Sequence, residues 1–186
     1  TTFNSDIGNW DVSSGTDFSR MFKGASSFNQ DIGSWEVKNG TSLYLMFANT
    51  DAFNQDISNW DVSSGTNFGY MFYNADVFNQ DISSWNVSSA TNFDAMFYQT
   101  SFNQDIGSWD VSNAESFYFM FAYNDAFNQD ISSWDVSNGN NFEYMFANTD
   151  AFNQDIRRWD VSSGTNFGNM FYRANLMQTN YGFSST

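Results

Sequence analysis

Carboxylates at fixed spacing are the side chains of this sequence that offer the most chemistry. In one set, the acidic row, an acidic residue or its amide stands between a Trp and a Val, at Asp11, Glu36, Asp61, Asn86, Asp110, Asp135 and Asp160. In a second set, the aspartate row, an Asp stands before an Ile, at Asp6, Asp31, Asp56, Asp81, Asp105, Asp130 and Asp155. Two carboxylates can share acid–base work, but an active site needs one differentiated pair in a pocket. Because these pairs recur in equivalent surroundings, we predict that the protein is not an enzyme.

The acidic row is expected on the outward face of a strand, opposite the Trp and Val beside each acid. Stacked strands would place neighbouring acids about 4.8 Å apart, where two full charges in water repel by roughly 0.9 kcal/mol. This repulsion is bearable, so a merely solvated acidic face is one interpretation. We predict the other: a binding surface for a protein or matrix partner, with a basic partner or cations as the matching chemistry.

The aspartate row is expected to be structural, because an Asp in a turn accepts backbone N–H bonds. Calcium is the alternative, since calcium prefers oxygen ligands and more carboxylates lie five residues upstream in the return loops, at Asp51, Asp76, Asp125 and Asp150. The sequence has no EF-hand spacing and no Gly-rich calcium repeat. We therefore predict no cofactor and no metal site, with calcium left open as the lesser alternative.

Composition excludes several classes of function. The net charge is −15, with six basic residues at Arg20, Lys23, Lys38, Arg157, Arg158 and Arg173, so a phosphate backbone would be repelled and nucleic acid is not an expected partner. Histidine and cysteine are absent, which removes the usual general base, zinc sites and disulfides. No run approaches the roughly 18 apolar residues of a membrane span, and the chain begins without a signal peptide. We expect a soluble fragment or a processed chain that does not insert into a membrane.

Both rows belong to a repeat. Each unit begins with a Phe, at Phe3, Phe28, Phe53, Phe78, Phe102, Phe127 and Phe152, with a spacing of 25 residues except for one step of 24. Repeats of this length predict a solenoid, in which each coil stacks on its neighbours. We predict seven coils over residues 1–176, starting near 3, 28, 53, 78, 102, 127 and 152, and a degenerate C-terminal cap over residues 177–186, where the pattern decays.

Two periodicities follow one another in each unit. Residues 57–62 carry Ile, Trp and Val at i, i+3 and i+5, and the last pair alternates as in a strand whose Trp and Val face the core. Residues 68–72 carry Phe, Met and Phe at i, i+3 and i+4, as on one face of a short helix, and Thr66 is placed to cap that helix. These patterns predict an α/β fold: a leucine-rich-repeat-like solenoid with a parallel β-sheet on one face and short helices or turns on the other.

The consensus FNQDIxxWDVSxxTxFxxMF resembles the BspA-like leucine-rich repeats of surface proteins, and the resemblance covers residues 3 to about 176. It implies a cell-surface or secreted interaction role rather than an enzyme. The chain departs from that family's pattern in two places. Gly or Ala, as at Gly65, replaces the usual Val before Thr, and Phe, as at Phe68, mostly replaces the usual Met after it. We expect these departures to compensate, with a small residue beside a large one in the core.

These observations predict an extracellular or cell-surface repeat protein for interaction or adhesion, presenting the acidic row. The alternative is a structural repeat element that assembles end to end into a surface filament. An ordinary internal unit begins directly after Thr2, so the first coil is expected to leave Phe3 and Trp10 uncovered. Head-to-tail self-association through that end is therefore the second kind of partner that we consider.

Overall fold

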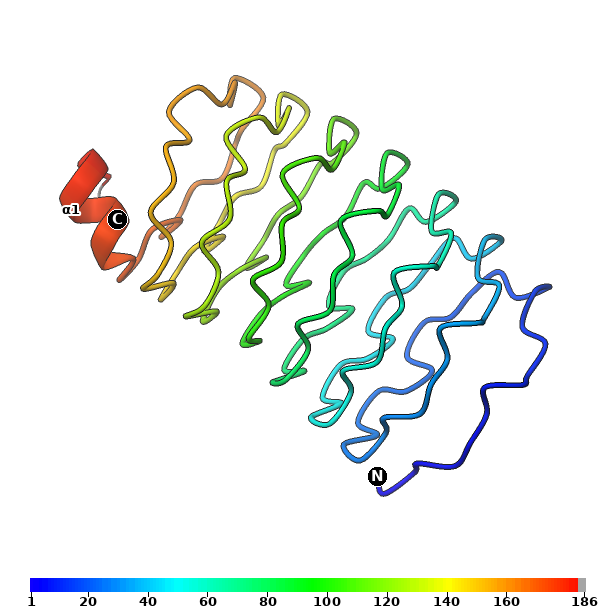
Figure 1. Cartoon of the computed structure of the whole chain (residues 1–186). Helices are drawn as coiled ribbons and strands as arrows, with labels where there is room; N and C mark the ends of the chain where they lie inside the picture. Colours follow the sequence, from blue (N-terminus) through cyan, green and yellow to red (C-terminus); the bar gives the residue numbers. More distant parts are fainter. Residues whose placement is uncertain (184–186) are drawn as a thin grey trace.

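The computed structural model describes residues 1–183, and there the chain winds into a row of stacked coils that runs from the N-terminus to the C-terminus (Figure 1). The only helix in this part of the chain is α1 (Asn175–Tyr181), at the C-terminal end. Successive coils are joined by isolated parallel bridges, at Asp17–Ser42, Ser42–Asn67, Asn67–Asn92, Asn92–Ser116, Ser116–Asn141 and Asn141–Asn166. None of these bridges extends into a strand within residues 1–183.

The predicted α/β architecture is therefore wrong: in the described residues the coils carry neither a parallel β-sheet on one face nor short helices on the other. The segment 68–74, which includes the predicted helix, is a run of tight turns. Its N–H groups alternate between two kinds of partner. Those of Phe68 and Tyr70 donate to the next coil, to Asn92 O at 3.0 Å and Asp94 O at 2.6 Å, whereas that of Met71 closes a turn on Phe68 O at 3.1 Å. None of them closes the i to i−4 bond of an α-helix. Tyr70 also has a φ of 58°, a left-handed conformation that interrupts both helix and strand.

The stretch 57–62, predicted as a strand, is bounded by two turns. The Trp60 N–H donates to Ile57 O at 3.1 Å, and the Gly65 N–H donates to Val62 O at 2.8 Å. Each of these bonds closes a four-residue turn. Within residues 1–183 no bridge joins this stretch to the neighbouring coils.

Up to three side-chain turns bend each coil. In the third coil the side-chain oxygens of Asp56, Asp61 and Asn67 accept the backbone N–H two residues on, at 2.9, 3.1 and 3.0 Å. Short polar side chains of this kind hold a turn without helix or strand, and the predicted structural role of the aspartate row is confirmed in this respect. Thr66 caps no helix; its hydroxyl donates to Thr41 O of the preceding coil at 3.1 Å.

Aromatic rings that stack from coil to coil form the core. The ring centroid of Phe53 lies 5.9 Å from that of Phe28 and 6.1 Å from that of Phe78, with nearly parallel planes, and all three rings are fully buried. The expected pairing of a small with a large residue is also present. A Cβ added at Gly65 would lie 2.6 Å from Cζ of Phe68, so the ring occupies the space that a side chain there would need.

The Trp side chains tie each coil to the one before it. In the six coils from Trp35 to Trp159, the indole Nε1–H donates to the carbonyl of an Ile in the preceding coil, as Trp60 does to Ile32 O at 3.0 Å. All six indoles are buried, and the prediction that the Trp residues form core is confirmed for them. Trp10, in the first coil, is 56% exposed.

Helix α1 replaces part of a further coil at the C-terminal end. Its Asn180 Nδ2 donates to Asn153 Oδ1 at 2.8 Å. In other coils the equivalent Asn oxygen accepts the backbone N–H of the Asn in the following coil. Met177 is fully buried. The helix begins two residues before the predicted cap, and positions 184–186 of that cap lie outside the described residues. No helix among the described residues is long and apolar enough to span a membrane.

Candidate functional site

The acidic row lies on the surface, but not on a strand. All seven side chains are exposed, at Asp11, Glu36, Asp61, Asn86, Asp110, Asp135 and Asp160. Each lies between a Trp and a Val, in a stretch between two turns that forms no strand, so the strand-face description is wrong while the outward placement is right. The structure thus repeats the same exposed position from coil to coil along the stack.

One oxygen of most members holds a turn. Asp61 Oδ1 accepts the Ser63 N–H at 3.1 Å and the Ser63 hydroxyl at 2.6 Å, and every other Asp of the row accepts the corresponding N–H. Asn86 Oδ1 does the same with Ser88, at 3.1 and 2.7 Å. The turn therefore needs the side-chain oxygen and not the charge. The second carboxylate oxygen of Asp61 accepts no hydrogen bond from another described residue.

The five aspartates of the acidic row are ionised at neutral pH. Hydrogen bonds from the serine two residues on lower the pKa of Asp11, Asp61, Asp110, Asp135 and Asp160 below the ordinary value. At two of these positions, Asp110 and Asp160, the negative charge of Asp135 in an adjoining coil partly opposes the lowering of the pKa. The charges of neighbouring coils therefore act on one another.

The side chains of the aspartate row hold turns of the coils. Its members accept the N–H two residues on, as Asp56 does from Ser58 at 2.9 Å. Asp155 additionally pairs with Arg157 at 2.7 Å, and hydrogen bonds from Arg157 lower the pKa of Asp155 to about 2. Within residues 1–183 no group of three or more acidic side chains is arranged to hold a metal ion, and calcium binding stays an untested alternative.

The net charge is concentrated in the central coils. Between Lys38 and Arg157 the sequence has no Lys or Arg and 15 of its 21 acidic residues. The remaining six acidic and six basic residues cancel, so this central stretch carries the whole net charge of −15. A cation that approaches the middle of the stack meets acidic side chains and no basic residue of the chain itself.

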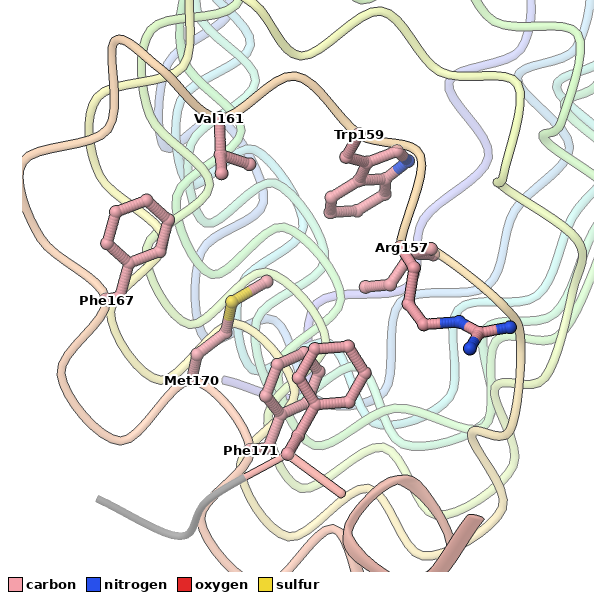
Figure 2. A pocket seen from close by; sticks show the side chains of 8 residues that line it. Arg157, Trp159, Val161, Phe167, Met170 and Phe171 are labelled. Carbon is pink, nitrogen blue, oxygen red and sulfur yellow. The ribbon is translucent and has the colours of Figure 1, made fainter. Parts of the chain in front are cut away.

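Both ends of the stack expose apolar side chains. Phe3, Trp10 and Met21 are exposed in the first coil. Beside α1, a cavity of about 320 Å³ is lined by Trp159, Val161 and other side chains of the last coil, as Figure 2 shows. A stack of coils exposes such rings and such an apolar cavity at an end that no further coil covers.

A third surface, which we call the tyrosine row, was not predicted from the sequence. It crosses the coils along the segment that follows the Thr position of each repeat unit. It comprises Tyr44, Tyr70, Tyr73, Tyr98, Phe119 and Tyr144, with Tyr118 and Tyr123 at its side. The ring centroids follow one another at 5.9 Å (Tyr44–Tyr70), 5.6 Å (Tyr70–Tyr73), 4.7 Å (Tyr73–Tyr98), 5.9 Å (Tyr98–Phe119) and 4.5 Å (Phe119–Tyr144). The six rings of the row are half-buried, and Tyr123 at its side is exposed.

The geometry defines a repeat protein of stacked coils held by side-chain turns and aromatic stacking. Family comparison agrees with this class: the model described as "Mycoplasma protein of unknown function, DUF285" matches residues 1–101 and again residues 91–183. The chain belongs to this repeat family. No curated protein and no solved structure matches it.

Proposed function

We propose that this chain is an interaction module displayed at the cell surface or secreted, and that its acidic row binds a basic protein partner. The observation that carries the proposal is the restriction of the whole net charge to residues 39–156, where three of the four acidic-row positions are exposed carboxylates. Similarity of the repeats to BspA-like surface repeats supports the location outside the cell. We propose the chain as a member of that group on the same consensus.

The acidic row is suited to binding because its charge is separable from its structural task. Asp61 holds its turn through Oδ1, which leaves Oδ2 for a cation. The aspartates of the row are already ionised, so a partner would not have to remove a proton. Exposed ion pairs contribute about 0.2–1 kcal/mol each, and a row of them gives useful affinity only when a partner engages several at once.

Octalysine is the probe for the first test, and the variant is Asp61→Asn/Asp110→Asn/Asp135→Asn. Asn86 already shows that an amide keeps this turn, so the variant should fold with an unchanged circular dichroism spectrum. Loss of three exposed ion pairs should weaken octalysine binding on the order of tenfold at low salt, measured by calorimetry. The loss should shrink as added salt screens the charges.

A charge-matched control decides between the row and net charge alone. Asp51→Asn/Asp76→Asn/Asp125→Asn removes the same number of charges from exposed loop positions whose side chains hold no turn. This control should weaken octalysine binding by less than about threefold. Equal losses in the two variants would show that the acidic row has no special role, and the proposal would be wrong.

End-to-end assembly is the second candidate function, and the ends of the stack favour it. The Trp10 indole lacks the Ile carbonyl that the six buried Trp side chains use. The two ends also carry net charges of opposite sign. Residues 1–38 carry three basic and five acidic residues, whereas residues 157–186 carry three basic and one acidic residue. Contact between opposite ends is heterologous and does not close, so it gives filaments.

Sedimentation velocity over a range of concentrations tests this assembly. The chain should form longer species as its concentration rises, and Trp10→Ser should reduce this growth by removing the largest exposed ring of the first coil. A single monomeric species for the chain at all concentrations would exclude end-to-end assembly.

A further inference from the structure

We propose that the tyrosine row is a binding surface for an arginine-bearing segment of another polypeptide. This surface is separate from the acidic row, and the proposal does not depend on that row's function. The segment would lie along the stack, because the ring-to-ring contacts run without interruption from Tyr44 in the second coil to Tyr144 in the sixth.

The coil itself does not require aromatic residues at these positions. Tyr70, Phe119 and Tyr144 share one repeat position with a left-handed φ of 55–58°. The same position holds Leu45 and Ala95 in the coils on either side of Tyr70, with the same left-handed backbone. Packing therefore accepts a small or aliphatic residue here, and the partly exposed rings are an addition to the fold rather than a condition for it.

Two carboxylates lie among the rings, and each has one oxygen that accepts no hydrogen bond from another described residue. Asp94 Oδ1 accepts the Tyr118 N–H at 3.1 Å and the Ser116 hydroxyl, and Glu143 Oε2 accepts from Asn166 Nδ2 at 2.9 Å. No hydrogen bond from another described residue reaches Asp94 Oδ2 or Glu143 Oε1. Each of these two carboxylates thus has one oxygen available to a donor that approaches the tyrosine row.

The carboxylates are close enough to act on the phenols. Burial raises the pKa of Tyr70, and the charge of Asp94 raises it further. Burial likewise raises the pKa of Tyr118, followed by the charge of Glu143. The phenols of Tyr70 and Tyr118 therefore stay neutral, and the surface combines π faces with negative potential.

Arginine is the side chain that fits both features. Its planar guanidinium stacks on aromatic rings and pairs bidentately with a carboxylate, whereas the ammonium of lysine is a compact point charge. The chain shows this stacking itself: Arg20 lies over the ring of Tyr44 at 5.4 Å, at the first ring of the row, and Arg173 lies over Tyr172 at 5.3 Å. Between Lys38 and Arg157 the chain supplies no cation of its own. The central rings and their carboxylates are thus left for a partner's arginines.

Octaarginine and octalysine, equal in charge, are the probes for the test. Calorimetry at 150 mM salt should show tighter binding of octaarginine to the full chain, by about fivefold or more. Tyr70→Leu/Phe119→Leu/Tyr144→Leu follows the precedent of Leu45 and should fold. It should lower octaarginine affinity about tenfold, as expected for three lost cation–π contacts, and octalysine affinity less than about twofold. Asp94→Asn/Glu143→Gln keeps the rings and should also reduce the preference for octaarginine.

The controls separate this proposal from the one for the acidic row. Asp61→Asn/Asp110→Asn/Asp135→Asn should leave the ratio of octaarginine to octalysine affinity unchanged, whether or not it lowers both. Urea midpoints of each variant verify folding. Equal affinity of the chain for the two peptides, or an equal loss of both in the leucine variant, would refute the proposal. Tighter binding of a neutral oligosaccharide such as maltohexaose, insensitive to salt and lost in the leucine variant, would assign the row to carbohydrate instead.

Discussion

Replacing Trp85 by Phe tests the contact that ties one coil to the next. The Trp85 indole is buried and donates to Ile57 O of the preceding coil at 3.1 Å. Phe keeps an aromatic ring in the stack but has no N–H to donate. The change therefore removes the inter-coil hydrogen bond and part of the packed volume, while leaving the local turns in place.

The magnitude follows from two losses. Ile57 O still accepts the Trp60 N–H at 3.1 Å, so it is not orphaned, and the missing bond costs about 0.5–1.5 kcal/mol rather than a full desolvation penalty. Phe is smaller than Trp by roughly 40 Å³, which at ~24 cal/mol per Å³ of cavity adds about 1 kcal/mol. We expect Trp85→Phe to lower the free energy of unfolding by about 2 kcal/mol.

Equilibrium unfolding in urea, followed by circular dichroism, measures this loss. With an m-value near 2 kcal/mol/M the midpoint should fall by about 1 M. The matched control is Trp10→Phe, because Trp10 is exposed and its indole donates to no carbonyl of a preceding coil. The control should change the free energy of unfolding by less than about 0.5 kcal/mol. Equal losses in the two variants would mean that the indole hydrogen bond and its burial do not hold the coils together.

Three further predictions concern the turns, the pH dependence and the C-terminal helix. Asp56→Ala should lower the urea midpoint, whereas Asp56→Asn should not, because only Ala removes the oxygen that accepts the Ser58 N–H; equal midpoints would contradict this. The pKa of Asp155 in the folded protein is about 2, below the ordinary 3.8. The ionised side chain therefore stabilises the fold fully above pH 4, and this stabilisation is lost as pH falls towards 2. Asp155→Asn should flatten the plot of urea midpoint against pH in that window. Met177→Ala should lower the free energy of unfolding by about 2–5 kcal/mol if α1 is a packed cap, and an unchanged urea midpoint would show that α1 is only loosely attached.

The repeat length, the core residues and the direction of stacking were predictable from the sequence, because large apolar side chains recur with the coil. Secondary structure was not. Phe68, Met71 and Phe72 fall at the i, i+3 and i+4 positions of a helix, but consecutive tight turns also bring such residues to one side. What decides between the two is where the N–H groups bond: those of Phe68 and Phe72 bond to the next coil, and that of Met71 closes a tight turn. The apolar pattern of one coil does not predict a hydrogen bond to another coil.

The candidate surfaces were predictable to different degrees. The acidic row was visible because one acid stands between Trp and Val in each unit, and its Asp-Val-Ser order contained the signal for a side-chain turn. The tyrosine row was not visible, because its members occupy different repeat positions: that of Tyr70, that of Tyr73 and that of Tyr44. Only the coil geometry brings these positions together, so a search for one periodic residue type passes over them.

At the acidic row, one position holds a turn of the fold and, as we propose, also binds a partner. Natural variation within the chain separates the two tasks. Asn86 keeps the turn without the charge, and Glu36 keeps the charge although it accepts no turn hydrogen bond from another described residue. Both coils stack like the others, so neither the charge nor the turn is indispensable in any one coil. The fold therefore does not require six acids in seven positions, and the neighbouring charges oppose one another where they meet. We propose that a cationic partner offsets the repulsion between the neighbouring charges.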